Sequence, residues 1–170
     1  MKYLLKLIVT IFLSFFLFTS LMSEEKNSFI DIDFLLQNSN IGKRVLKNIS
    51  DLNQKNINQL EKKNKKLIDL EIEINNKKNV ISEKDFKNEV SNFQEKVKTF
   101  TEEKNKIVKD FKNYRNSELE KVFKAFNPII SDYMKQNSIK ILFDSKNIFM
   151  GSPNSNITQE VLKLINNKIE

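Results

Sequence analysis

The 170-residue chain contains no cysteine and no histidine. Without them it lacks the thiol nucleophile, the commonest general base and two side chains that often bind transition metals. The absence of cysteine also excludes disulfides and the attachment of a lipid to a cysteine. We therefore do not expect an enzyme, and we expect no catalytic residue, no cofactor and no metal.

Two short patterns could indicate ligand binding, and neither is specific. Asp31 and Asp33 alternate with apolar residues and could place two carboxylates on one side of a strand, where a cation could bind. Such a pair is more often simply the solvated face of a strand. Gly42-Lys43 lacks the upstream glycine and the following Ser or Thr of a phosphate-binding loop, so it predicts no site.

The first 23 residues have the composition of a secretory signal peptide. Lys2 and Lys6 give a basic start, residues 7–18 are apolar except at two positions, and small polar residues lead to Ser23. The apolar run is shorter than the roughly 20 residues that cross a bilayer as a helix. Cleavage near Ser23 is therefore favoured, and an uncleaved anchor is the alternative.

The charge of the chain indicates what it attracts. Lys and Arg number 29 against 22 Asp and Glu, and removal of Lys2 and Lys6 with the leader lowers the net charge from +7 to +5. For an exported protein this charge favours acidic proteins and anionic membrane surfaces over nucleic acid.

Two apolar stripes dominate the middle of the chain. One runs from Val45 to Ile74 and the other from Phe86 to Tyr133, each in steps of three and four residues, as in the seam of a coiled coil. Between them lies a polar cluster without a period, and Ser82 then provides a cap for a new helix. The pattern predicts a helical hairpin over residues 41–134 with its tip near residues 76–82.

The rest of both helical segments is polar, so neither has a second apolar face for further helices. This favours an arm that protrudes from the body over a compact bundle. Polar residues interrupt the seams at Asn56, Lys63, Lys104 and Glu118, which lowers stability and fixes the register.

Pro128 lies inside the second helical pattern, where it removes one backbone hydrogen bond. We expect a kink at the place where the arm joins the body. The alternative is that the helix ends at Asn127.

Strand signals lie only at the two ends of the mature chain. Residues 29–34, 139–144 and 147–151 predict three short strands that form a small body together with a C-terminal helix, which Asn156 caps. Residues 24–40 would hold the first strand, and residues 135–170 the other two strands and the helix. Because so small a body buries little core and has no disulfide, we expect an oligomer. The residues expected to pack in the assembled body are Ile30, Ile32, Phe34, Ile139, Ile141 and Phe143.

Lysines crowd midway along the first helix and around the tip. They could form only a solvated helix face, or they could contact a client protein or an anionic surface. The candidates for such contact are Lys62, Lys63, Lys65, Lys66, Lys77, Lys78, Lys84 and Lys87.

In their order and spacing these features resemble the Skp/OmpH family of periplasmic chaperones for outer-membrane proteins. The resemblance covers the whole chain: the leader, the strand at residues 29–33, the helix entry at residues 39–43, the paired charged helices, the strand at residues 139–144 and the end at residues 157–161. The chain departs from the family at Gln136-Asn137, where a glycine is common, and at Asn156, where an aspartate is common. Both replacements are mild, since Asn tolerates the left-handed conformation and caps helices well.

The resemblance implies a mainly α fold with a small β body, from which a long antiparallel coiled-coil hairpin protrudes. It further implies a homotrimer whose arms enclose a cavity. In the periplasm of a Gram-negative bacterium, such a trimer would hold unfolded outer-membrane proteins without ATP until membrane insertion. Two alternatives stay open: an envelope-associated coiled coil that spaces or tethers other components, and a binder of anionic lipid or lipopolysaccharide.

Overall fold

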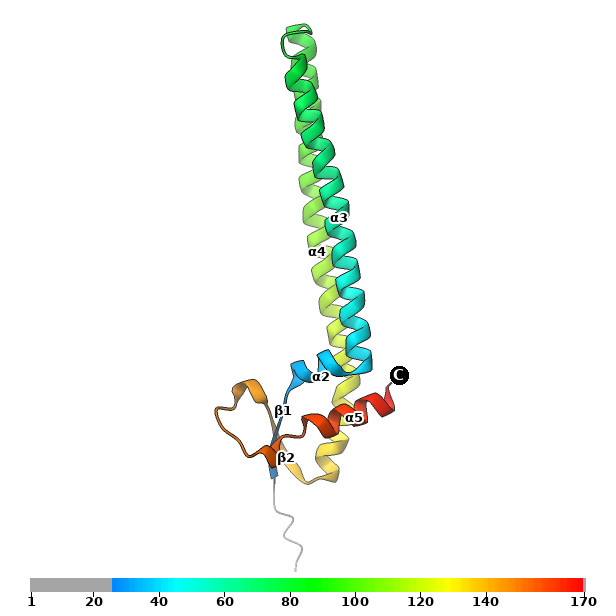
Figure 1. Ribbon diagram of the computed structural model, residues 1–170, viewed down its shortest axis with the longest axis vertical. Coiled ribbons are helices and arrows are strands. Elements are labelled where there is room, and N and C mark those ends of the chain that lie inside the picture. The colour runs from blue at the N-terminus through cyan, green and yellow to red at the C-terminus, as the bar shows by residue number, and fades with distance from the viewer. Residues whose placement is uncertain (1–25, 170) are drawn as a thin grey trace, which may run out of the picture.

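The computed structural model describes residues 26–169, so the expected signal peptide lies outside the described residues. A hairpin of two long helices stands on a small body, and the tip of the hairpin is the point farthest from that body (Figure 1). The elements are β1 (Lys26–Ile30), α2 (Ile32–Asn38), α3 (Asn40–Lys77), α4 (Glu83–Gln136), β2 (Ile139–Asp144), 3-10 turns at Ser145–Asn147 and Pro153–Ser155, and α5 (Thr158–Lys168).

Serine caps begin both helices of the hairpin. The Ser39 hydroxyl accepts a hydrogen bond from the Gly42 N–H at 3.1 Å, and the Ser82 hydroxyl accepts one from the Asp85 N–H at 3.2 Å. Acidic residues in the first turn of α4 add a favourable interaction with the helix dipole. The two helices are joined by residues 78–82, within the range expected for the tip.

Helix α4 continues through Pro128 to Gln136, so the alternative that the helix ends at Asn127 is wrong. Proline costs this helix one hydrogen bond. Phe126 and Ile129, on either side of the proline, are 1% and 6% exposed. The burial of these two side chains stabilises the helix across Pro128.

The body contains a two-stranded parallel sheet, in which Asn27 pairs with Ile141 and Ile30 with Asp144. Parallel neighbours need a long connection, and here the whole hairpin provides it. The core lies where the sheet, α2, α5 and the root of the hairpin meet. Its most buried apolar residues are Ile30, Leu35, Val122, Phe126, Val161 and Ile165.

The first strand differs from its prediction, because it ends at Ile30 and helix α2 begins at Ile32. The Asp31 carboxylate accepts a hydrogen bond from the Phe34 N–H at 2.8 Å and so caps α2, while the Asp31 N–H donates to the Thr158 hydroxyl at 2.9 Å. Asp33 lies in the first turn of the helix and pairs with Lys146 at 2.5 Å. The two carboxylates therefore do not share a strand face.

The third predicted strand, residues 147–151, is also wrong. The Asp144 carboxylate accepts a hydrogen bond from the Lys146 N–H at 3.1 Å, which turns the chain into a 3-10 turn, and the following residues are irregular. Asn156 was predicted to be the N-cap of the last helix, but Ile157 holds the cap position of α5 and Asn156 lies one residue before it. The Asn156 side chain still accepts a hydrogen bond from the Thr158 N–H at 3.0 Å, in the first turn of the helix.

Within residues 26–169, no helix combines the length and the apolar character needed to cross a membrane.

Candidate functional site

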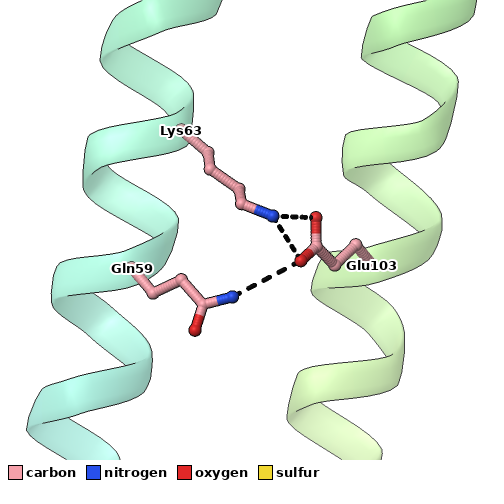
Figure 2. A network of polar contacts seen from close by, with 3 residues as sticks. All are labelled: Gln59, Lys63 and Glu103. Carbon is pink, nitrogen blue, oxygen red and sulfur yellow. Dashed lines mark hydrogen bonds and ion pairs between the residues drawn. The ribbon is translucent and has the colours of Figure 1, made fainter.

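The arm is the candidate site, and its two helices are joined midway by a polar network (Figure 2). The Lys63 ammonium group contacts both carboxylate oxygens of Glu103, at 2.5 and 2.6 Å, and the Gln59 amide donates to the same carboxylate at 3.4 Å. The side chains of Lys63 and Glu103 are 43% and 33% exposed. Because both side chains are partly buried between the helices, their ion pair interrupts the apolar seam. A polar pair at this position fixes the alignment of α3 against α4.

Lys63 was expected to interrupt the first seam, but its partner was missed. The prediction placed Lys104 in the second seam, whereas Lys104 is exposed and the half-buried position belongs to Glu103. Steps of three and four from Phe100 to Ile107 allow either residue, so the spacing does not distinguish them. A signal was available in the charge, since a glutamate is the better partner for Lys63.

A second link between the helices lies near the tip. Lys77 contacts Glu73 at 2.8 Å and Glu89 at 3.3 Å. The hydrogen bond to Glu73, then the one to Glu89, raises the pKa of Lys77, and the hydrogen bond from Lys77 lowers the pKa of Glu73.

A groove of about 810 Å³ runs between these two links. Half-buried seam residues Leu67, Leu70 and Phe100 contribute apolar surface to it. Its polar lining consists of Lys63, Lys66, Asp69, Glu73, Asn92, Glu95, Lys96, Thr99 and Glu103. The groove therefore presents charges of both signs, and its acidic residues were not among the predicted contacts.

The predicted contact lysines fall into two groups. Lys63, Lys77 and Lys87 form ion pairs, the last with Glu83 at 2.8 Å. Five are exposed and have no ion pair in the described part of the chain: Lys62, Lys65, Lys66, Lys78 and Lys84. The second group keeps its charge available to another molecule.

The residues predicted to pack in an assembled body also divide. Ile30 and Ile139 are 2% and 8% exposed and already lie in the core of the single chain. Ile32 and Phe34, both in α2, are half-buried.

The outward-facing apolar residues of the body lie on β2 and in the loop after it. Ile141 and Phe143 are 50% and 44% exposed, and Phe149 and Met150, which the prediction missed, are 101% and 84% exposed. Two consecutive large apolar residues before Gly151 were the available signal. Among residues 26–169, no group of three or more acidic side chains could hold a metal.

Fold and surface together define a class: a long antiparallel coiled-coil arm on a small mixed body, with charge and apolar surface exposed along its length. The family described as "Outer membrane protein (OmpH-like)" matches residues 26–165, and the chain belongs to this family. The resemblance expected from the sequence is confirmed.

The fold is similar to the crystal structure of a candidate outer membrane chaperone (OmpH-like) from Caulobacter crescentus CB15. The TM-score is 0.76 at 17% identity, over 84% of this chain and 85% of that chain. The similarity establishes a mainly helical fold with long helices and a small strand pair. No curated protein matches the sequence.

Proposed function

We propose that this chain is an ATP-independent holdase of the periplasm, which captures unfolded outer-membrane proteins in a cavity between the arms of a homotrimer. The observation that carries the proposal is the arm of an OmpH-like protein extending far beyond its own core. In α3, the last residue that belongs to the core of the body is Ile49, while the helix continues to Lys77. Those 28 further residues are about 42 Å of helix at about 1.5 Å per residue. Ile74 is buried near the tip but lies apart from that core.

The arm can serve a client because its seam is weak and its surface is charged. Lys63 and Glu103 replace an apolar layer, and exposed lysines such as Lys62 and Lys66 leave positive charge available. Unfolded barrel strands alternate apolar and polar residues, and a basic surface draws acidic chains over distance. The solved OmpH-like structure, described as a candidate outer membrane chaperone, supports the same role by analogy.

Assembly is supported by the exposed apolar residues of the body. Ile141 and Phe143 point away from the core on one face of β2, and a single chain leaves both about half exposed. Packing three bodies together would cover such residues and set the arms around a common space. Periplasmic location follows if the leader is cleaved near Ser23, and N-terminal sequencing of the protein isolated from its cells tests that step.

The direct test uses the mature protein at micromolar concentration, in excess over a barrel protein diluted from urea. We expect a trimeric mass by light scattering and suppression of the turbidity that the barrel protein develops alone. A monomer that leaves the turbidity unchanged would refute the proposal. An intact N-terminus together with that result would favour the tethering alternative.

Salt provides a second test of the charge argument. Raising the salt concentration should slow capture of the client more than it speeds release, because screening weakens long-range attraction more than close contact. A capture rate independent of salt would contradict this part of the proposal. Binding to anionic vesicles, lost when Lys78 and Lys84 become Glu while client protection persists, would establish lipid binding as a separate activity.

A further inference from the structure

One side of the arm carries the same pattern of residues on both helices. Each helix presents an apolar residue, then a charged residue four positions closer to the tip, then a second apolar residue seven positions farther. We call these six residues the ungrooved face. They are Ile57, Glu61 and Ile68 in α3 and, because α4 runs the other way, Val108, Lys104 and Val97 in α4.

The ungrooved face lies away from the groove of the arm. At about 100° per residue, its three members on each helix fall within about 40° of one another. On α3 they lie about 140–180° around the helix from the groove residue Lys66, and on α4 about 100–140° from the groove residue Glu103. None of the six lines the groove.

The matching residues of the two helices lie at the same heights along the arm. The ion pair between Lys63 and Glu103 sets the register, and the contact of Lys77 with Glu89 near the tip keeps it. Counted from the first pair, the members of each match differ in position by one residue, which is about 1.5 Å of helix. The face therefore has two apolar levels with a charged level between them.

A single chain leaves the whole face accessible. The four apolar side chains keep a third or more of their surface exposed, with 39% for Ile57, 48% for Ile68, 37% for Val97 and 56% for Val108. Glu61 and Lys104 are exposed and form no ion pair within residues 26–169.

The two edges of the face carry opposite charge. Glu71, nearer the tip, gives the α3 edge a second exposed carboxylate, and Lys112, nearer the body, gives the α4 edge a second exposed ammonium group. Lys65 does not alter this division, because it lies about 160° around α3 from the seam residue Leu67 and so points away from the hairpin. An acidic edge beside a basic edge makes the face complementary to a second copy of itself.

We propose that the ungrooved face binds the ungrooved face of a second copy of this chain, with the two arms side by side and pointing in the same direction. A two-fold axis along the arms would place α3 of each copy over α4 of the other. Each residue would then meet the matching residue of the opposite helix at its own height. The apolar residues would form two layers, and Glu61 would pair with the partner's Lys104 between them.

The same charges disfavour an antiparallel pair. In that arrangement α3 would lie on α3 and α4 on α4, so Glu61 would stand near the partner's Glu61 and Lys104 near the partner's Lys104. Like charges brought together at an interface weaken it and select against that alternative. Charge thus selects the direction of the pair as well as its occupant.

Arm pairing rests on the assembly proposed above, but not on client capture. Bodies joined at one end would make the arms point in the same direction and would hold them at a high effective concentration. Such tethering is what a contact of a few side chains needs to form. Two arms of one assembly would then close on each other while no client is held.

The first experiment tests which residues meet. Because the chain has no cysteine, Ile68→Cys and Val97→Cys each carry one thiol, and any disulfide formed after the two proteins are refolded together joins two chains. A disulfide requires Cα atoms about 4.4–6.8 Å apart. Mild oxidation should link position 68 to position 97 in several-fold higher yield than it links Ile68→Cys to Thr99→Cys, whose thiol lies in the groove.

The other outcomes separate this proposal from the earlier one. Equal yields in the two mixtures overturn arm pairing. A higher yield from Ile57→Cys with Ile68→Cys, which meet only in an antiparallel pair, overturns the parallel arrangement. A trimer that protects a barrel protein from turbidity but gives no selective link overturns arm pairing alone, whereas a monomeric mass overturns both the assembly and the pairing.

The second experiment tests the charged level by the yield of the same link. When both cysteine chains also carry Glu61→Lys, lysine faces lysine across the pair and the yield should fall. When one carries Glu61→Lys and the other Lys104→Glu, opposite charges face again and the yield should recover. Lys66→Glu, on the groove side of α3, is the control and should leave the yield unchanged. A yield that does not fall, or does not recover in the mixed pair, overturns the proposal.

Discussion

At the scale of single residues, the root of the arm depends on a contact that allows no side chain. A Cβ atom placed on Gly42 would lie 1.9 Å from the Leu36 carbonyl oxygen and 2.7 Å from the Ser39 hydroxyl. Ser39 is itself fully buried and caps α3. The corner between α2 and α3 is therefore built around a glycine in helical conformation, needed for space and not for flexibility.

We predict that Gly42→Ala destabilises the protein by about 2 kcal/mol or more, because backbone must move to admit the methyl group. Helix propensity alone predicts the opposite, a gain of up to about 1 kcal/mol. Urea unfolding followed by circular dichroism measures the difference, with the exposed Ser50→Ala in the same helix as control. If Gly42→Ala were as stable as Ser50→Ala, the contact with Leu36 would not constrain the corner.

The pH dependence of the arm follows from Glu73 and Lys77 at the tip. The pKa of Glu73 lies below its ordinary 4.5, so its contribution is present above that pH and is lost as the pH falls through the lowered pKa. The pKa of Lys77 lies above its ordinary 10.5, so its contribution is present below that pH and is lost as the pH rises through the raised pKa.

With no histidine in the chain, we expect a constant midpoint of thermal unfolding between about pH 6 and pH 9 and a fall in acid. Glu73→Gln should make the acid fall smaller. Melting curves followed by far-UV circular dichroism, which reports secondary structure, would test this, and a midpoint that drifts between neutral pH and pH 9 would contradict it.

At the scale of elements, the sequence was sufficient for the two long helices and for the strand at residues 139–144, but not for α2 or for the other two predicted strands. The apolar stripes repeat over many turns, so a single ambiguous residue hardly changes the prediction. The segment Phe29 to Phe34 offers only a few alternating residues, and the cap formed by Asp31 ends the strand early. The backbone N–H of Asp31 also donates a hydrogen bond to the Thr158 hydroxyl, 127 residues away in the sequence. No local sequence pattern can predict such a contact.

The candidate site was predictable in part for the same reason. Lysines at the tip and midway along α3 could be found from composition, and the spacing placed Lys63 in the seam, but neither identified Glu103 as the partner of Lys63. Nor does composition show that the exposed residues Ile68 and Val97 lie at nearly the same height along the arm, because that follows only from the register of the two helices. The residues are visible in the sequence, but their alignment is a property of the folded arm.

The ion pair between Lys63 and Glu103 should control that alignment. We expect Lys63→Glu to destabilise the arm by about 1 kcal/mol, because two half-exposed carboxylates would then face each other, and the double variant Lys63→Glu/Glu103→Lys to recover most of the loss. Thermal unfolding of the two single variants and the double variant measures the coupling. Lys65→Glu, at an exposed position of the same helix, is the control and should change little. Without recovery in the double variant, the pair would not set the register.

At the scale of the whole molecule, the proposed function requires a rigid body and an adaptable arm. In the proposed assembly, the body would have to be rigid and join other copies, since it has a small core and no disulfide. The arm would have to adapt to its client, and its polar layer and exposed surface favour this. The proposal places the contact between copies at the apolar residues on the outward face of β2, where assembly would decide how many arms surround a client.

We therefore predict that Ile141→Glu/Phe143→Glu separates the chains while leaving the arm folded. Both side chains are about half exposed on the same face of β2, so charge there costs a single chain little but would be buried without a partner in an assembly. Light scattering should report a monomer, circular dichroism an unchanged helix content, and turbidity a loss of protection, since one arm presents a client with only one surface. Val80→Glu, a charge placed on an exposed residue at the tip, should keep the wild-type mass. If the β2 variant also kept the wild-type mass, the outward face of β2 would not be where the chains meet.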